Sequence, residues 1–463
     1  MPALTPRSLT PRSLTRPDLQ DRLDRMVAEG DMPGAQLAVL VDGAVTTVAS
    51  GVLNITTGQP ATTASLFQVG SIGKLWTATA AMQLVQEGVL DLDEPIRAHL
   101  PELSVGDEVT SANVTMRHLL THTSGIEGDV FDDTGNNDDA LARYVELLAT
   151  LPPVHALGAT WSYCNAGFGI AGLLIARQAG TTFEQAIRDR LVVPLGIERF
   201  AWNADEAILL GAAVGHVPGP DGQPVVTPTY SFPRNAAPAG LVTITAADLL
   251  AFAAAHLDDG GPLLSADLAV AMRTPQVDCP SHLADRWGLG FMIHDWDGTT
   301  VVGHGGATIG QFAELYMVPE HDVAVALLVN GSRGRSDHAL LSGVLADTCG
   351  AALPPIPTPS AGTVTDPARY IGRYSRLGVD LEVALDGDDL VLTRKVHGAL
   401  ADIPGEESMT MPLHPTGEVG RLLARVPGRA VVHAPVILHG VDDERPAYLH
   451  MGGRAHVRSD QPT

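Results

Sequence analysis

A serine and a lysine stand three residues apart in the segment Phe67-Gln-Val-Gly-Ser71-Ile-Gly-Lys74. On a helix this spacing places the Ser71 hydroxyl and the Lys74 amine one turn apart on the same face, where they can share a proton. A serine hydroxyl needs an adjacent base to become a nucleophile, and burial near a positive helix end lowers the pKa of a lysine enough to make it that base. The segment therefore predicts Ser71 as a nucleophile and Lys74 as its base.

Chance is the alternative explanation, because Ser-x-x-Lys is a short pattern. However, Lys74 is one of only two lysines in the chain, the other being Lys395, and the small residues Gly70 and Gly73 flank Ser71. The start of a helix also offers the backbone N–H of Ser71 to an oxyanion. These features favour a functional pair.

A phenol and an amide follow in the segment Trp161-Ser-Tyr163-Cys-Asn165. If alternate residues face one cleft, the Tyr163 hydroxyl can relay a proton and the Asn165 amide can bind a substrate carbonyl. A buried core tyrosine is the alternative. Both residues are predicted to be catalytic.

A third motif, His304-Gly305-Gly306-Ala307, comes directly after a predicted strand at residues 300–302. Glycines leave the backbone without side chains, which suits a strand edge where a substrate lies against the main chain. Gly305 and Gly306 are therefore predicted to bind substrate. His304, beside them, is predicted to be catalytic. An ordinary turn histidine is the alternative. No clustered ligand spacing accompanies His304, so neither a metal nor another cofactor is expected.

The segments that must position these motifs alternate between helix and strand patterns. A helix is predicted over residues 71–87, and a hairpin over 35–50 turns at Asp42-Gly43, where positive φ angles are tolerated. Strand patterns return at 313–318 and 323–330, so strands from both ends of this region are expected to share one antiparallel sheet. The predicted fold class is α+β, an antiparallel sheet with a helical subdomain.

The chain of 463 residues is long for a single hydrophobic core. A proline-rich stretch at 353–366 is predicted to be an extended linker. We therefore expect a catalytic domain at 17–352 and, at 367–463, a small all-β domain built from short strand patterns.

The charge and composition of the chain limit the kinds of partner that it is expected to bind. The net charge of −24 repels polyanions, which argues against nucleic acid. No run of 18 apolar residues occurs, so no membrane span is expected. Residues 1–16 are basic and proline-rich and lack the apolar core of a secretory signal, so they are expected to form a flexible leader and the protein to be cytoplasmic.

The ordered set Ser71-x-x-Lys74, Tyr163-x-Asn165 and His304-Gly-Gly306 resembles the active-site elements of the serine β-lactamase and penicillin-binding-protein superfamily, which includes class C β-lactamases, D,D-peptidases and esterases. The resemblance implies a serine β-lactamase/transpeptidase-like fold, an oxyanion hole formed by the N–H groups of Ser71 and Ala307, and an acyl-side contact from Asn165. In this superfamily Lys-Thr-Gly is common where this chain has His304-Gly-Gly306, and that difference argues against efficient β-lactam hydrolysis.

A β-rich domain after the linker makes the chain most similar to the penicillin-binding-protein-type thioesterases of the surugamide-cyclase group, which carry a C-terminal lipocalin-like barrel. That resemblance implies a peptidyl thioester on a carrier protein as substrate and head-to-tail macrolactamisation as the reaction. Water-driven D-stereospecific peptidases, esterases and β-lactamase-like hydrolases, acting on small peptides or esters, are the alternative. A non-catalytic penicillin-binding sensor is a remote third.

Two further segments are candidates for substrate contact. Arg454 follows two glycines, and its flat guanidinium can bind a carboxylate or carbonyl in two-pronged fashion and orient an attacking amine. A salt bridge is the alternative. The acidic segment 127–139 is either a cleft-lining loop or a solvated one.

Overall fold

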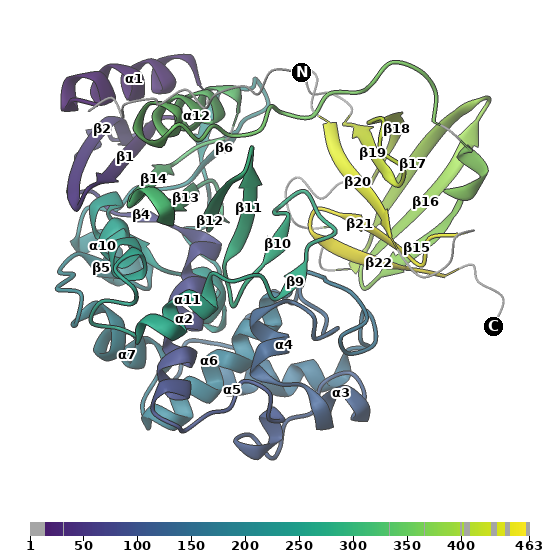
Figure 1. Cartoon of the computed structure of the whole chain (residues 1–463), viewed down its shortest axis with the longest axis horizontal. Coiled ribbons are helices and arrows are strands. Elements are labelled where there is room, and N and C mark those ends of the chain that lie inside the picture. The colour runs from purple at the N-terminus through teal and green to yellow at the C-terminus, as the bar shows by residue number, and fades with distance from the viewer. Residues whose placement is uncertain are drawn as a thin grey trace, which may run out of the picture.

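The computed structural model describes residues 14–30, 32–332, 334–364, 366–398, 401, 408–426, 433–439 and 445–459. Most of the predicted leader, residues 1–13, therefore lies outside the described residues. Figure 1 shows two parts, a larger part that contains helices and strands and a smaller all-β part, joined by one extended segment of chain. In the described part of the chain, no helix is both long enough and apolar enough to cross a membrane.

The larger part is built on an antiparallel sheet whose order, among the described residues, is β3-β2-β1-β14-β13-β12-β11-β10-β9. Strands from both ends of the region pair directly, since β1 and β14 are neighbours from Ala35↔Val329 to Val41↔Val323. The predicted hairpin is present, with Asp42 and Gly43 at positive φ. The strands are β1 (Gly34–Val41), β2 (Ala44–Asn54), β3 (Gln59–Pro60), β9 (Val277–Asp278), β10 (Arg286–Trp287), β11 (Met292–Trp296), β12 (Thr299–Ala307), β13 (Phe312–Val318) and β14 (Val323–Val329).

Helices cover both faces of this sheet, which explains why β14 is apolar and buried at every position. Alternate residues of β14 enter two different cores. Val325 and Leu327 pack with the terminal helices α1 (Arg16–Glu29) and α12 (Arg335–Cys349), whereas Ala326 and Leu328 pack with the helical subdomain. Figure 1 shows α1 and α12 together on one side of the sheet.

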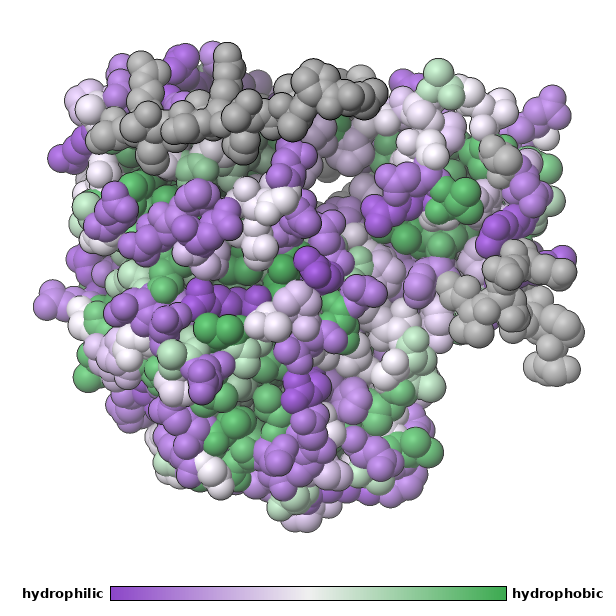
Figure 2. Space-filling view, viewed as in Figure 1, coloured by the Kyte–Doolittle hydropathy of each residue, from purple (hydrophilic) through white to green (hydrophobic). Residues whose placement is uncertain are grey.

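The helical subdomain carries the central helices of the larger core. Its elements are α2 (Gly73–Gln86), α3 (Glu108–Asn113), α4 (Met116–Leu120), α5 (Ala140–Leu147), α6 (Asn165–Ala179), α7 (Phe183–Ile187), α8 (Ala204–Leu209), α9 (Ala237–Gly240), α10 (Ala246–Leu257) and α11 (Ala266–Met272). Short strands β4 (Phe67–Gln68), β5 (Phe200–Ala201) and β8 (Thr243–Ile244) form a second sheet, and β6 (His216–Pro218) pairs with β7 (Pro224–Val226). On the visible face, hydrophilic side chains are widespread and apolar ones lie in scattered groups (Figure 2).

The smaller part is a closed barrel with its own apolar core. Its strands are β15 (Gly372–Arg376), β16 (Val379–Asp386), β17 (Asp389–Val396), β18 (Met409–Pro415), β19 (Arg421–Arg425), β20 (His433–His439), β21 (Tyr448–Met451) and β22 (Arg454–Arg458). Residues 353–364 contain neither helix nor strand. The predicted fold class, an α+β catalytic fold with an antiparallel sheet plus a small all-β barrel, is confirmed.

Candidate active site

Ser71 lies in a short 3₁₀ turn, Gly70–Ile72, directly before α2, which begins at Gly73. The sequence predicted a helix starting at Ser71, and the tighter turn at its start is the difference. Gly70 has φ +51°, and a Cβ atom there would lie 2.5 Å from the backbone nitrogen of Ala307. The turn is therefore shaped by close approach to β12, which only glycine permits.

The Ser71–Lys74 pair has hydrogen-bonding geometry. Lys74 Nζ lies 3.1 Å from Ser71 Oγ and donates to the carbonyl oxygen of Ala239 at 2.7 Å. The Lys74 side chain is completely buried. Burial holds the pKa of Lys74 well below its ordinary value, and the positive charge of Arg454 lowers this pKa further. A lysine in this setting can accept the proton of the serine hydroxyl.

Tyr163 lies on the extended segment just before α6, between two cations. Lys74 Nζ is 4.9 Å from the centre of its ring and the Arg454 guanidinium carbon is 4.8 Å from it. Burial raises the pKa of Tyr163, and the Ser71 hydroxyl counteracts part of this shift. Ser71 is therefore near, although the Tyr163 hydroxyl makes no hydrogen bond of standard geometry to the described residues.

Asn165 is the first residue of α6, so the predicted extended alternation ends there. The helix begins because Cys164 caps it, its sulfur accepting from the Gly167 N–H at 3.2 Å. The Asn165 side-chain nitrogen is 3.4 Å from a carboxylate oxygen of Asp129, a long contact.

His304 lies within β12, whose last residue is Ala307, so the glycine motif continues the strand instead of following it. Its side chain is 1% exposed, and burial lowers its pKa to about 3, which makes the imidazole neutral. The ring packs against Tyr163 and Trp287, with centroid distances of 6.1 and 5.5 Å. His304 is therefore buried beside Tyr163, where its neutral ring forms part of the surroundings of Lys74.

A pocket of about 240 Å³ lies in front of Ser71. The structure brings Ser71, Tyr163, Asn165, Ala307 and Arg454 together in its wall, whereas Lys74 and His304 are not in the wall. The remaining lining is mostly apolar and consists of Val130, Phe131, Tyr144, Phe232, Pro233, Asn235, Ala236, Ala239, Gly240 and Leu241. Such a lining suits an apolar acyl group and limits water.

Gly306 is expected to be indispensable for the predicted oxyanion hole, which consists of the N–H groups of Ser71 and Ala307 at this pocket. A Cβ atom on Gly306 would lie 1.9 Å from the carbonyl oxygen of Val69 and 3.1 Å from the Ser71 nitrogen. Gly306→Ala should therefore push β12 away from Ser71 and lower the acylation rate by about a hundredfold, because removing one oxyanion donor costs that much or more. Gly334→Ala is the matched control, since a Cβ there meets nothing within 4 Å. Burst kinetics with a chromogenic ester measure both, and an unchanged rate in Gly306→Ala would contradict this role.

For Arg454, the sequence offered two interpretations, a substrate contact and a salt bridge, and the structure shows features of both. It lines the pocket, but its two-pronged edge faces Asp129, with Nε and Nη2 at 2.9 and 2.7 Å from the two carboxylate oxygens. A third N–H is 3.3 Å from the carbonyl oxygen of Gly452. Since arginine has five N–H groups, this arrangement leaves donors for a substrate carbonyl.

Two residues near the reacting groups were not singled out by sequence reasoning. Asp129 lies in the acidic segment noted above, but nothing local distinguishes it from the other acids there. His122 packs against Tyr163 with a centroid distance of 4.3 Å and the rings tilted by 31°, and its Nδ1 accepts from the Cys164 N–H at 3.0 Å. His122 has a φ of +60°, a backbone feature that the sequence does not reveal.

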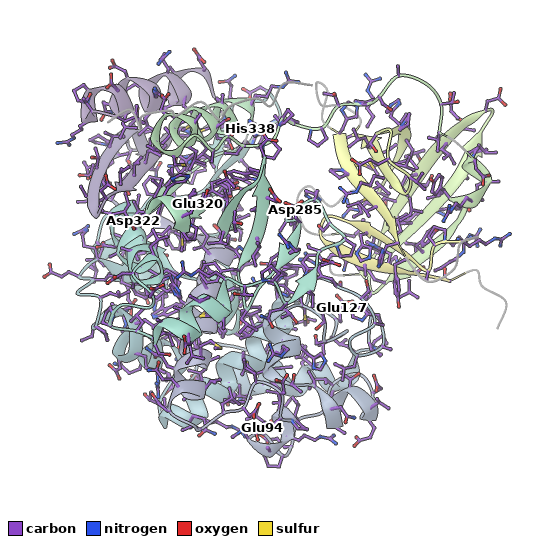
Figure 3. The ribbon with its side chains drawn as sticks, in the orientation of Figure 1. Glu94, Glu127, Asp285, Glu320, Asp322 and His338 are labelled. Carbon is purple, nitrogen blue, oxygen red and sulfur yellow. The ribbon has the colours of Figure 1, made fainter. Side chains whose placement is uncertain are left out.

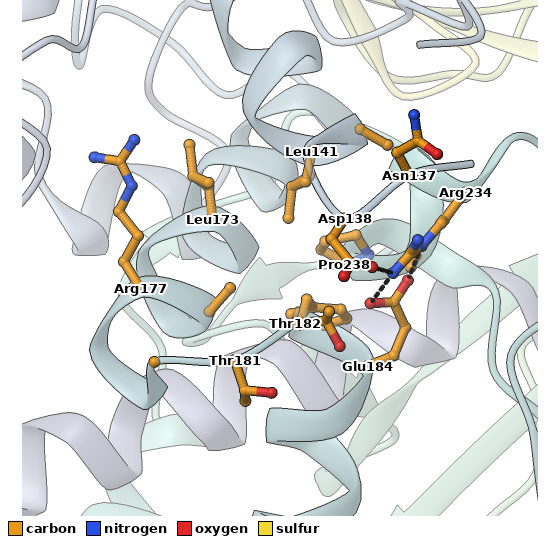
Figure 4. Close-up of a pocket in the computed structure, with 15 residues that line it drawn as sticks. Asn137, Asp138, Leu141, Leu173, Arg177, Thr181, Thr182, Glu184, Arg234 and Pro238 are labelled. Atoms are coloured by element: carbon orange, nitrogen blue, oxygen red, sulfur yellow. Dashed lines mark hydrogen bonds and ion pairs between the residues drawn. The ribbon is translucent and has the colours of Figure 1, made fainter. Parts of the chain in front are cut away.

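A second cavity, of about 450 Å³, lies beside α6 and α7 (Figure 4). None of the predicted catalytic residues lines it. Arg234 at its edge joins Glu184 at 2.8 Å and Asp138 at 3.0 Å, and it donates to the carbonyl oxygen of Asn136 at 2.6 Å. These contacts tie the loop that carries Phe232 to the loop that carries Phe131, so they brace two walls of the Ser71 pocket.

The fold and the Ser71 site are those of a serine hydrolase or acyltransferase of the β-lactamase type. The Beta-lactamase family model matches residues 19–349, and the chain belongs to this family. Penicillin-binding protein 4 of Amycolatopsis lactamdurans is 40% identical over 370 residues, covering 78% of this chain and 97% of that protein.

Among solved structures, one is similar to this chain over the barrel as well as over the larger part. The crystal structure of SurE is similar over 96% of this chain and 99% of that chain, with a TM-score of 0.80 and 29% identity. The D-amino acid amidase from Ochrobactrum anthropi SV3 is similar over 71% of this chain and 95% of that chain, with a TM-score of 0.60 and 25% identity. Only the first of these two likenesses extends over the barrel as well as the larger part.

Proposed function

We propose that this protein is a stand-alone peptide cyclase of the thioesterase type. It would take a peptidyl group from a carrier-protein thioester onto Ser71 and release it by attack of the peptide's own N-terminal amine. The observation that carries this proposal is the likeness to SurE over nearly the whole of both chains, barrel included. The barrel also supplies Arg454 to the pocket, so it belongs to the working site.

In acylation, the Ser71 oxygen would attack the thioester carbonyl while its proton passes to Lys74 Nζ, 3.1 Å away. The C–S bond then breaks, and the proton leaves with the thiol. In release, the peptide amine attacks the carbonyl carbon of the Ser71 ester and passes a proton to the Lys74–Tyr163 pair. The amide C–N bond forms, the ester C–O bond breaks, and the pair returns that proton to the Ser71 oxygen. Lys74 is suited to both steps because its lowered pKa favours the neutral amine.

Cyclisation and hydrolysis differ only in the second nucleophile. The apolar lining around Ser71 disfavours water, and an amine that is tethered to the acyl group has a high effective concentration. A crystal structure of SurE with D-Leu is similar to this chain with a TM-score of 0.77 and 28% identity. We therefore expect a D-residue at the acylating end of the peptide.

The test uses matched peptidyl thioesters of N-acetylcysteamine that end in a D- or an L-residue, each with a free or an acetylated N-terminus. We expect cyclic product from the free D-peptide, at least about tenfold faster than from its L-isomer. The acetylated peptides, which lack the nucleophile, should give only linear acid. Chromatography with mass spectrometry measures both products, and exclusively linear acid from every substrate would contradict the cyclase.

If every substrate gives only linear acid, the second candidate, a D-stereospecific hydrolase, is favoured. The likeness of the larger part to D-amino acid amidase supports this candidate. Intact-mass spectrometry separates a third possibility. A sensor would retain a stoichiometric acyl group on Ser71 without turnover, whereas either enzyme would release it.

A further inference from the structure

The barrel reaches the active site through the tight turn between β21 and β22. Gly452 and Gly453 in this turn have φ of 59° and 76°, the pattern of a type I′ hairpin turn. The carbonyl oxygen of Gly453 accepts from the Tyr163 N–H at 2.9 Å. Next to it, the Ala455 N–H donates to Ser162 Oγ at 3.1 Å. The barrel is therefore attached to the backbone segment that carries Tyr163.

A buried carboxylate in the larger part holds two arginines of the barrel. Asp129 forms the two-pronged contact with Arg454 and lies 3.1 Å from Arg376, which is also 3.6 Å from Glu127. The side chains of Asp129 and Arg376 are each 8% exposed. Figure 3 labels Glu127 where the two parts meet. Burial by itself would raise the pKa of Asp129, but Arg454 and Arg376 outweigh it and keep the carboxylate ionised.

The contact fixes where the Arg454 charge lies. A two-pronged arginine–carboxylate pair sets both distance and direction, whereas a single contact leaves the long side chain free to rotate. In this position the guanidinium is against the Tyr163 ring, and Lys74 Nζ lies against the same ring. One positive charge is thus held near both groups that handle the serine proton.

We propose that Asp129 is a positioning residue through which the barrel completes the acylation site: it holds Arg454 against Tyr163, where the guanidinium assists proton transfer from Ser71. Acylation of Ser71 is common to a cyclase and a hydrolase, so this role rests on the serine chemistry alone and is tested separately from cyclisation.

The experiment measures the rate at which a fluorophosphonate probe labels Ser71 in the full-length chain. Asp129→Asn and Arg454→Met should each lower this rate by about tenfold or more. The double variant should be no slower than Arg454→Met, because Asp129 acts only through that arginine. The double variant removes the Asp129–Arg454 pair as a whole and leaves Arg376 with Glu127, 3.6 Å away, so it tests the role even if Asp129→Asn folds poorly. Circular dichroism and gel filtration report the fold.

Arg376→Met is the matched control for docking of the barrel. It removes an ion pair of Asp129 at the same junction but leaves Arg454 in place. A labelling rate close to that of the wild type is expected for it. If Arg376→Met is as slow as Arg454→Met, the arginines serve docking alone and the proposal is wrong. The proposal is equally wrong if Asp129→Asn labels at the wild-type rate, or if the two losses multiply in the double variant.

The pH dependence of the labelling rate is a second measurement, which would not change if Asp129 had only a structural role. Charged and titratable groups around Lys74 are Tyr163, Arg454, Asp129, Cys164, His122 and His304, where both imidazoles are held neutral by their lowered pKa values and the phenol by its raised pKa. Arg454 lowers the pKa of Lys74 and Asp129 raises it.

If Asp129→Asn releases Arg454, the loss of the positive charge that has the larger effect on Lys74 should raise the pKa of Lys74 and move the acid-side midpoint of labelling to higher pH. If Arg454 stays in place without the carboxylate, the midpoint should move to lower pH. An upward shift in Asp129→Asn and Arg454→Met, with none in Arg376→Met, supports the proposal. A downward or absent shift in Asp129→Asn overturns it.

Discussion

Ser71→Ala is expected to abolish turnover and covalent labelling while leaving the fold intact. The change removes the attacking oxygen and almost no volume, in a turn whose shape depends on the glycines around it. Loss of a covalent serine nucleophile lowers turnover by several orders of magnitude in well-studied enzymes, so residual activity should be below about a hundredth of the wild-type value. Steady-state hydrolysis of a chromogenic ester and intact-mass spectrometry after fluorophosphonate treatment measure the two effects.

Ser342→Ala on α12 is the matched control, because it makes the same chemical change in a helix far along the chain from the site. It should label and turn over like the wild type. If Ser71→Ala keeps more than a hundredth of the activity or is still labelled at one equivalent, the nucleophile has been assigned to the wrong residue.

Lys74→Ala and Tyr163→Phe are each expected to lower the acylation rate by about a hundredfold or more, because each interrupts the path of the serine proton. The two losses should not multiply in the double variant, since Lys74 Nζ and the Tyr163 ring are 4.9 Å apart and the groups act as a unit. Stopped-flow burst kinetics give the rates. A double variant as slow as the product of the single losses would show that the two residues act independently.

The pH profile offers a second check on Lys74. The amine is a base only when neutral, so acylation should fall as the pH drops through the folded-state pKa of Lys74. That pKa lies well below its ordinary value because the side chain is buried. Lys395→Ala, at the exposed second lysine, is the control and should leave the acid-side midpoint unchanged. An acid-side midpoint near the ordinary pKa of lysine would contradict the assignment.

Arg454 makes more contacts around the active site than the sequence indicated. Sequence reasoning placed it at the peptide end that attacks the acyl-enzyme, after Ser71 is acylated. Its position 4.8 Å from the Tyr163 ring is the basis of the role in acylation that we propose for it. Arg454→Met is therefore expected to change the labelling rate as well as the product ratio.

Local spacing was enough to predict that the two groups of the first motif lie close together. Ser71 and Lys74 come within hydrogen-bonding distance because a helical turn brings residues three apart together, whatever the rest of the chain does. The Asp42-Gly43 hairpin, the apolar late strands and the proline-rich stretch before the barrel are likewise short-range patterns. Joint occurrence of the three motifs in order also indicated the family, which the match over residues 19–349 confirms.

Tertiary structure alone decided how the barrel meets the active site. Asp129 and Arg454 are 325 residues apart, and their contact depends on how two separately built cores dock. Tertiary packing also buried His304 against Tyr163 and Trp287 instead of in the pocket wall, because the register of β12 against β13 sets the face on which each side chain lies. A sequence specifies which residues can react through short-range geometry, but the burial and charge that tune Lys74 and Tyr163 come from side chains contributed by distant segments.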